Sequence, residues 1–166
     1  MPVQKEKSDS DIERTKKNRF ADKEKASGDS NQEVEFTCSL FFNHTHTENG
    51  NNKSQLCIKL ETVKLFAMMN YELTVEMEQR EKEIDINILG IKTNHNYLKE
   101  VEPAIAKMFC EELSGRFTLN IIRQDGCTNS AVLDVDSTKN GINIVQELIP
   151  PEKENYKFCN FIVTSE

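Results

Sequence analysis

The chain has 166 residues, of which 37% are hydrophobic and 30% charged, and its formal net charge is −7. This length suits one domain with a tail, and the composition excludes a collagen-like fibre and a disulfide-dense scaffold. The acidic balance argues against binding of nucleic acid by direct basic contact, because attraction to phosphates needs a surplus of Lys and Arg.

Residues 1–33 differ in composition from the rest of the chain. They contain six apolar residues, against eight basic and eight acidic ones. A segment this polar cannot bury enough apolar surface to offset the entropy lost on ordering. The sequence therefore predicts a disordered tail at 1–33 and a single folded domain at 34–166, on which the whole net negative charge falls.

The first half of the predicted domain alternates apolar and polar residues, which is typical of strands with one buried face. The segment 43–54 interrupts this pattern with Asn, Thr and Gly50, and we expect it to be an exposed loop. The predicted strands cover 34–42, 55–66 with a bulge near Glu61–Thr62, 71–77 and 84–88.

One amphipathic helix is predicted over 98–114. Apolar residues recur there every three or four positions, Pro103 suits a first helical turn, and Gly115 suits the position just past the helix end. We expect Ile105, Met108 and Phe109 to lie deep in the core, where this helix would cover a sheet.

Alternation returns after the helix and predicts strands over 117–121, 131–135, 142–149 and 156–164. Asp125–Gly126 marks a tight turn, and Asn140–Gly141 is typical of a type I′ hairpin. The predicted class is α+β: a mostly antiparallel, strongly curved sheet of about seven or eight strands packed around one helix. Apolar residues on the opposite faces of these strands indicate that the sheet closes on itself or self-associates; they are Leu89, Ile91, Ile122, Val132 and Val145.

Two histidines are the candidate metal ligands of the sequence. His44 and His46 lie two positions apart, so in an extended segment both point to the same side. A zinc site needs at least one more protein ligand, and no local motif supplies it. A solvated loop is the alternative interpretation, and we predict no cofactor.

The cysteines do not indicate disulfides or catalysis. There are five of them with no C-x-x-C pair, which favours reduced, buried thiols. Cys110 and Cys127 could act as nucleophiles, with His95 or another histidine as base, but no motif links such a pair. We therefore predict no catalytic residue, and whether the chain is an enzyme stays open, with a non-enzyme favoured.

The location and function are predicted mainly by exclusion. No run of about 18–20 apolar residues could span a membrane, and no apolar leader occurs near Met1, so we expect a cytoplasmic protein. The favoured function is a non-catalytic intracellular binding protein of the inhibitor, adaptor or small-chaperone type, whose partner is another protein or a second copy. The alternative is a small enzyme or ligand carrier that uses the concave face of the curved sheet, since such sites leave no local motif.

Overall fold

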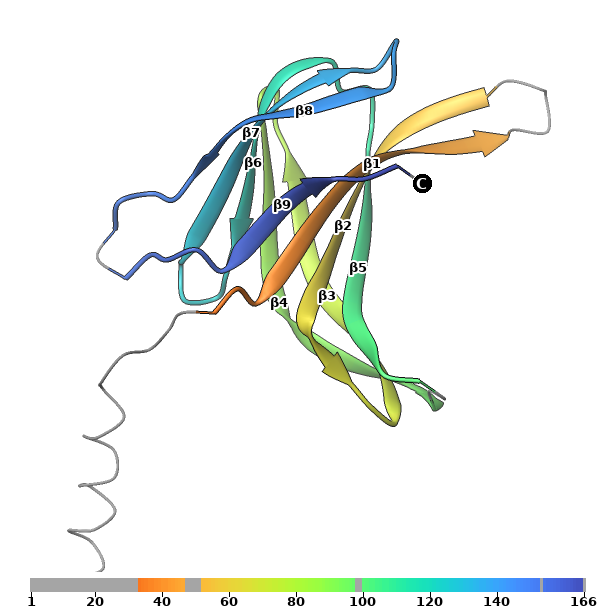
Figure 1. Cartoon of the computed structure of the whole chain (residues 1–166), viewed down its shortest axis with the longest axis vertical. Helices are drawn as coiled ribbons and strands as arrows, with labels where there is room; N and C mark the ends of the chain where they lie inside the picture. The colour runs from red at the N-terminus through yellow and green to blue at the C-terminus, as the bar shows by residue number, and fades with distance from the viewer. Residues whose placement is uncertain (1–32, 47–51, 98–99, 153, 166) are drawn as a thin grey trace, which may run out of the picture. The chain divides into compact units, whose positions relative to one another are not determined.

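The computed structural model describes residues 33–46, 52–97, 100–152 and 154–165. These residues form nine strands, and no part of them is helical. Figure 1 labels the strands in chain order. Their bounds are β1 (Phe36–His46), β2 (Asn52–Phe66), β3 (Met69–Gln79), β4 (Glu83–Tyr97), β5 (Glu102–Cys110), β6 (Gly115–Ile122), β7 (Thr128–Asp136), β8 (Gly141–Leu148) and β9 (Cys159–Val163).

All nine strands belong to one sheet, in the order β8-β7-β6-β4-β3-β5-β2-β1-β9. Five neighbouring pairs are antiparallel, and three are parallel: β4 with β6, β3 with β5, and β1 with β9. The sheet curls until it is nearly closed and barrel-like (Figure 1). The prediction of a strongly curved, mostly antiparallel sheet is confirmed in this respect.

The predicted α+β class is wrong, because the described part of 98–114 contains a strand instead of a helix. This strand is β5, which lies between β3 and β2. Met108 is buried as expected, but Ile105 is half-buried and Phe109 is 43% exposed. The burial therefore alternates along β5, with the inward positions taken by Ala104, Ala106, Met108 and Cys110.

Because the sheet is curled, its strands enclose the concave face, and no helix is needed to bury that face. Apolar side chains from eight of the strands form one buried cluster there, and the partly buried Ile142 and Ile144 of β8 pack against it. Many of its members have no exposed surface, among them Leu40, Ile58, Leu60, Ile86, Leu119 and Leu133. The concave face is thus occupied by the core of the protein.

Local irregularities adjust which side chains reach this core. The predicted bulge in β2 is confirmed by a register shift between Glu61 and Leu65. A second shift lies in β4, where Gly90 has a φ of 150° and Leu89 has no partner in β3. A bulge of this kind reverses the facing of later residues, so Ile91 comes to pair with the buried Leu73.

The two predicted turns between the later strands are present in different forms. Gly126 adopts a φ of 86° and donates its N–H to the Arg123 carbonyl, which confirms the tight turn. The β7–β8 hairpin also exists, but it is not a two-residue type I′ turn. Asp136 pairs with Gly141, so four residues make the connection, and the Asp136 carboxylate accepts the N–H groups of Thr138 and Lys139.

The side chain of Asn129 closes the sheet. Asn129 lies in β7, is 1% exposed, and faces the segment that leads into β9. Its Oδ1 accepts the N–H groups of Phe158 and Cys159 at 2.8 and 2.9 Å. Its Nδ2 donates to the carbonyls of Tyr156 and Thr128 at 2.8 and 3.0 Å. One buried amide therefore joins strands from opposite ends of the sheet order.

Two other predictions meet the structure only in part. The disordered tail at 1–33 lies outside the described residues except for Glu33, so it stays a prediction. Within the described ranges, no helix has the length and apolar character needed to cross a membrane.

The alternation of burial in β5 predicts losses of stability of different size for two adjacent residues. Met108→Ala removes a buried side chain and should lower the free energy of unfolding by about 2–4 kcal/mol. Phe109→Ala removes a half-exposed side chain and should lower it by about 1 kcal/mol or less. Chemical denaturation of both variants measures this difference. Equal losses, or a larger loss for Phe109→Ala, would contradict the assigned facing of β5.

Candidate functional site

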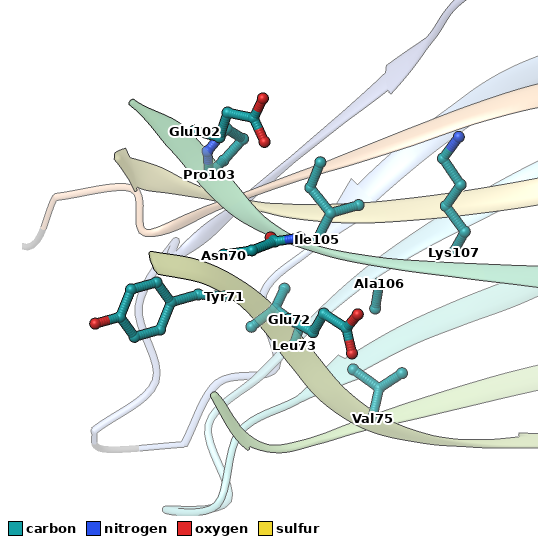
Figure 2. Close-up of a pocket in the computed structure, with 10 residues that line it drawn as sticks. All are labelled: Asn70, Tyr71, Glu72, Leu73, Val75, Glu102, Pro103, Ile105, Ala106 and Lys107. Carbon is teal, nitrogen blue, oxygen red and sulfur yellow. The ribbon is translucent and has the colours of Figure 1, made fainter. Parts of the chain in front are cut away.

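Strands β3 and β5 are neighbours in the sheet but share very little pairing. The described residues contain a single β3–β5 residue pair, Glu72 with Ile105. The two other parallel junctions, β4–β6 and β1–β9, each contain five pairs. We call the junction along Met69–Gln79 and Glu102–Cys110 the β3–β5 seam. Figure 2 shows its two strands separating beyond the region where they approach.

Two hollows lie along the β3–β5 seam. The first has a volume of about 480 Å³ and lies where Glu72, Leu73 and Val75 of β3 face Ile105 and Lys107 of β5 (Figure 2). The second has a volume of about 670 Å³ and lies toward the C-terminal ends of both strands, where Met77 and Gln79 face Phe109. The seam is therefore hollowed at its one residue pair and again toward the C-terminal ends of the two strands.

The backbone of β5 presents N–H groups toward this seam. Ala104 donates its N–H to Thr62 Oγ1 of β2 at 2.9 Å. Successive N–H groups of a strand point to opposite sides, so those of Ile105, Lys107 and Phe109 point toward β3. Lys107 and Phe109 have no paired residue in β3 within the described part of the chain. The seam thus resembles the open edge of a sheet, although it lies inside one.

The two outer edges of the sheet are better protected against pairing than the seam. In β8, Val145 forms a bulge between Ile144 and Gln146, which pair with neighbouring residues of β7. Glu147 of β8 pairs with the buried Ala131 of β7, and its carboxylate forms an ion pair with Lys157 at 2.9 Å. Bulges and inward-facing charges both discourage strand addition, as does the short length of the opposite edge, β9 (Cys159–Val163).

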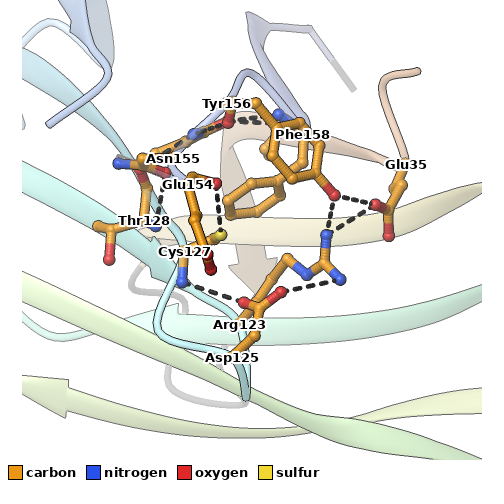
Figure 3. A network of polar contacts seen from close by, with 11 residues as sticks. Glu35, Arg123, Asp125, Cys127, Thr128, Glu154, Asn155, Tyr156 and Phe158 are labelled. Atoms are coloured by element: carbon orange, nitrogen blue, oxygen red, sulfur yellow. Dashed lines mark hydrogen bonds and ion pairs between the residues drawn. The ribbon is translucent and has the colours of Figure 1, made fainter. Parts of the chain in front are cut away.

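A polar network holds the other end of the sheet together (Figure 3). Arg123 donates to Glu35 Oε1 at 2.7 Å and to the Tyr156 hydroxyl, and it pairs with Asp125 at 3.2 Å. Tyr156 donates its hydroxyl to the same Glu35 oxygen at 2.6 Å. The guanidinium also lies 5.6 Å from the ring centroids of Tyr156 and Phe158. Because its partners already surround it, we assign Arg123 a structural role.

Tyr156 likewise has a structural role in this network, where its hydroxyl accepts a hydrogen bond from Arg123 and donates one to Glu35. Burial and the hydrogen bond to Glu35 raise the pKa of Tyr156 above its ordinary value. The hydroxyl therefore keeps its proton at neutral pH.

An apolar hollow of about 450 Å³ lies beside this network. Its lining includes Phe36, Val63, Phe66 and Ile91, with Glu35 at its rim. The size and the apolar lining are those of pockets that hold small molecules. This hollow is the part of the structure that best fits the ligand-carrier alternative.

A row of polar side chains on the outer face has the residue types of a hydrolase but a different arrangement. Asn120 donates to Asp85 at 2.7 Å, and Ser130 donates to the Asn120 amide oxygen at 2.6 Å. An amide oxygen cannot take the proton of a serine hydroxyl, so Ser130 is not activated by this contact. The row crosses β4, β6 and β7 and stabilises their pairing.

The structure does not build a site around the predicted metal ligands. His44 is exposed near the end of β1, opposite Ser54, and the side chains of His46 and His95 lie outside the described part of the structure. Among the described residues, no three His, Cys, Asp or Glu side chains gather closely enough to hold a metal ion. A metal at His44 and His46 therefore stays an untested prediction.

A comparison with family models, curated proteins and solved structures finds no match for this chain.

The sequence analysis missed the seam because the seam depends on parallel pairing between distant segments. The local signal that was available is the row of Glu72, Glu76 and Glu78, which alternates with apolar residues along β3. That row indicates an exposed strand face but not which strand lies beside it.

All five cysteines are buried, and none of them is in a disulfide. Burial, together with the nearby Cys57, raises the pKa of Cys110 to about 12. Burial and the charge of Glu147 raise the pKa of Cys159 to about 12 as well. Thiols in this state are poor nucleophiles at neutral pH, since the thiolate is the reactive form.

These raised pKa values predict a loss of stability in alkali. Above pH 9 the unfolded chain releases thiol protons that the folded chain keeps, so unfolding becomes more favourable as the pH rises toward 12. Each such thiol should lower the free energy of unfolding by about 1.4 kcal/mol per pH unit in this range. Chemical denaturation under reducing conditions at pH 8 and pH 10 measures the slope. Cys110→Ala should make it shallower by one thiol's share, and an unchanged slope would refute this assignment.

Proposed function

We propose that this chain is a binding protein that takes up an extended segment of a partner protein as an added strand between β3 and β5. The observation that carries the proposal is the single residue pair, Glu72 with Ile105, by which these neighbouring strands are joined. Strand addition is a general mode of peptide recognition in which main-chain hydrogen bonds supply the affinity. The binding-protein class predicted from the sequence thereby acquires a specific site.

The balance of hydrogen bonds favours insertion at this seam. An inserted strand of five residues would pair with β3 on one side and β5 on the other. It could form on the order of five ladder hydrogen bonds, each contributing about 0.5–1.5 kcal/mol net. Insertion breaks the one residue pair that now joins the strands. The gain exceeds this loss, and the remainder is available to order the incoming segment.

This mode of recognition suits an adaptor or a small chaperone better than an inhibitor. Main-chain pairing accepts many sequences in extended form, whereas an inhibitor must match the site of one enzyme. The absence of catalysis and the cytoplasmic location stay predictions from the sequence.

The ligand-carrier alternative is supported by a different observation. The apolar hollow beside Glu35 has room for a small molecule of about 450 Å³ or less. It lies at one end of the sheet, however, and the concave face on which the alternative was based is filled by the core. We therefore favour the seam as the functional site.

A reversible lock across the seam tests the proposal. Peptide binders are selected with the full chain from a displayed library of random twelve-residue peptides. The double variant Glu72→Cys with Ile105→Cys should form a disulfide, because paired strands bring Cα atoms within the usual range. Oxidation should then weaken peptide binding at least about tenfold, and reduction should restore it.

The control places the same bond where the strands are already fully paired. Thr45→Cys with Lys53→Cys joins β1 to β2 in a continuous ladder. Oxidation of this variant should leave peptide binding unchanged. The native thiols do not interfere, since all five are buried. Failure to select any peptide, or equal binding by the locked and unlocked seam, would refute the proposed function.

A further inference from the structure

We infer that the segment taken up in the β3–β5 seam alternates basic and aliphatic side chains, with an uncharged acceptor at the central outward position. This inference rests on the proposed function, and it names the chemical class of the partner. It follows from the side chains that β3 and β5 place on the two faces of the sheet.

The outward face of the seam is acidic on one side and partly apolar on the other. Glu72 pairs with Ile105, so continuing this parallel register places Thr74 opposite Lys107 and Glu76 opposite Phe109. A residue inserted between Glu76 and Phe109 would meet a carboxylate and a half-exposed aromatic ring. Arg or Lys satisfies both, because the charged head pairs with Glu while its stem and cation pack on the ring.

The same reasoning applies at the other end of this row. A residue inserted between Glu72 and Ile105 would meet a carboxylate and an aliphatic side chain. Glu72 now pairs with Lys92 at 3.3 Å and accepts a hydrogen bond from Asn94 at 3.1 Å. Lys92 is 64% exposed, and an ion pair this exposed is weak enough to be shared with an incoming cation.

Between these two positions the requirement changes. Thr74 and Lys107 flank the central outward position, and Lys107 would repel a cation there. Lys107 has no ion-pair partner among the described residues. An uncharged acceptor such as Gln can take a hydrogen bond from its ammonium group.

The inward face of the seam calls for aliphatic side chains. Leu73 and Val75 of β3 and Ala106 of β5 line the first hollow, and Leu73 and Ala106 belong to the buried core. Ala106 is small, so it leaves room for a branched side chain beside Leu73. Val or Ile at the two inward positions of the inserted segment would extend the core without polar groups that lack partners.

The resulting pattern is basic, aliphatic, uncharged acceptor, aliphatic, basic. It reads the same in both directions, so the recognition does not depend on whether the segment enters parallel or antiparallel to β3. Glu76 is the residue best suited to test it. Glu76 is exposed, and within the described part of the chain it has no hydrogen bond or ion pair.

The test compares two synthetic peptides that differ only in charge. The first is acetyl-Thr-Arg-Val-Gln-Val-Arg-Thr-amide, and the second carries Glu in place of both Arg residues. Isothermal titration of the full chain should show the Arg peptide binding at least about tenfold more tightly than the Glu peptide. Glu76→Lys should weaken the Arg peptide and strengthen the Glu peptide, whereas Glu152→Lys, an exposed change outside both strands and both hollows, should alter neither.

The outcomes separate this inference from the proposed function. Equal binding of the two peptides with no effect of Glu76→Lys would overturn the basic pattern and leave strand uptake standing. The pattern would be overturned as well if library-selected peptides bind at the seam and the Arg peptide does not. If no peptide binds to the protein that lacks the disulfide across the seam, the proposed function itself is overturned.

Discussion

The hydrogen bonds of Asn129 are the interaction on which the rest of the structure depends. A curved sheet without a helix can bury its concave face only by bringing its own first and last strands together. These strands do not pair here; the Asn129 side chain of β7 makes three hydrogen bonds to Tyr156, Phe158 and Cys159 and a fourth to Thr128 of its own strand. The N–H of Thr128 adds a hydrogen bond to Asn155 Oδ1 of the same segment. Each polar atom of the buried Asn129 side chain is satisfied, so its desolvation is offset. The ring of Arg123, Glu35 and Tyr156 strengthens the same closure from the surface (Figure 3).

The closure of the sheet determines which strand junctions are fully paired and which are not. Two of the junctions beside the Asn129 bridge are regular ladders, β6–β7 with eight residue pairs and β1–β9 with five. The β3–β5 seam has one pair and two hollows. Both seam strands are also disturbed on their other sides, by the bulge between β2 and β5 and by the register shifts between β3 and β4. Strands that bend away from each other in this manner leave main-chain groups available to an inserted strand, and for this reason we propose the seam, and not the filled interior, as the functional site.

The sequence predicted the strands well and the one helix badly, for a reason that β5 makes plain. Every strand with a polar outer face shows a clear period of two, as in β3, where Leu73, Val75 and Met77 alternate with glutamates. In β5 the outward positions include the apolar Ile105 and Phe109, so apolar residues also recur at helical spacing. The inward residues of β5 include two alanines, which are common in helices, and Pro103 is compatible with the start of either element. The candidate site depends on that same strand, and on a parallel neighbour more than 20 residues away, which no local pattern could identify.

Amide hydrogen exchange along β5 tests the central claim most directly. The account predicts alternation: the N–H groups of Ala104, Ala106 and Met108 face the ladder with β2 and should exchange slowly. Those of Lys107 and Phe109 face the open seam and should exchange at least about a hundredfold faster, since few bonds must open to expose them. Uniformly slow exchange over 104–109 would contradict the account, because it would show that β3 and β5 are joined by a continuous ladder and that no open seam exists.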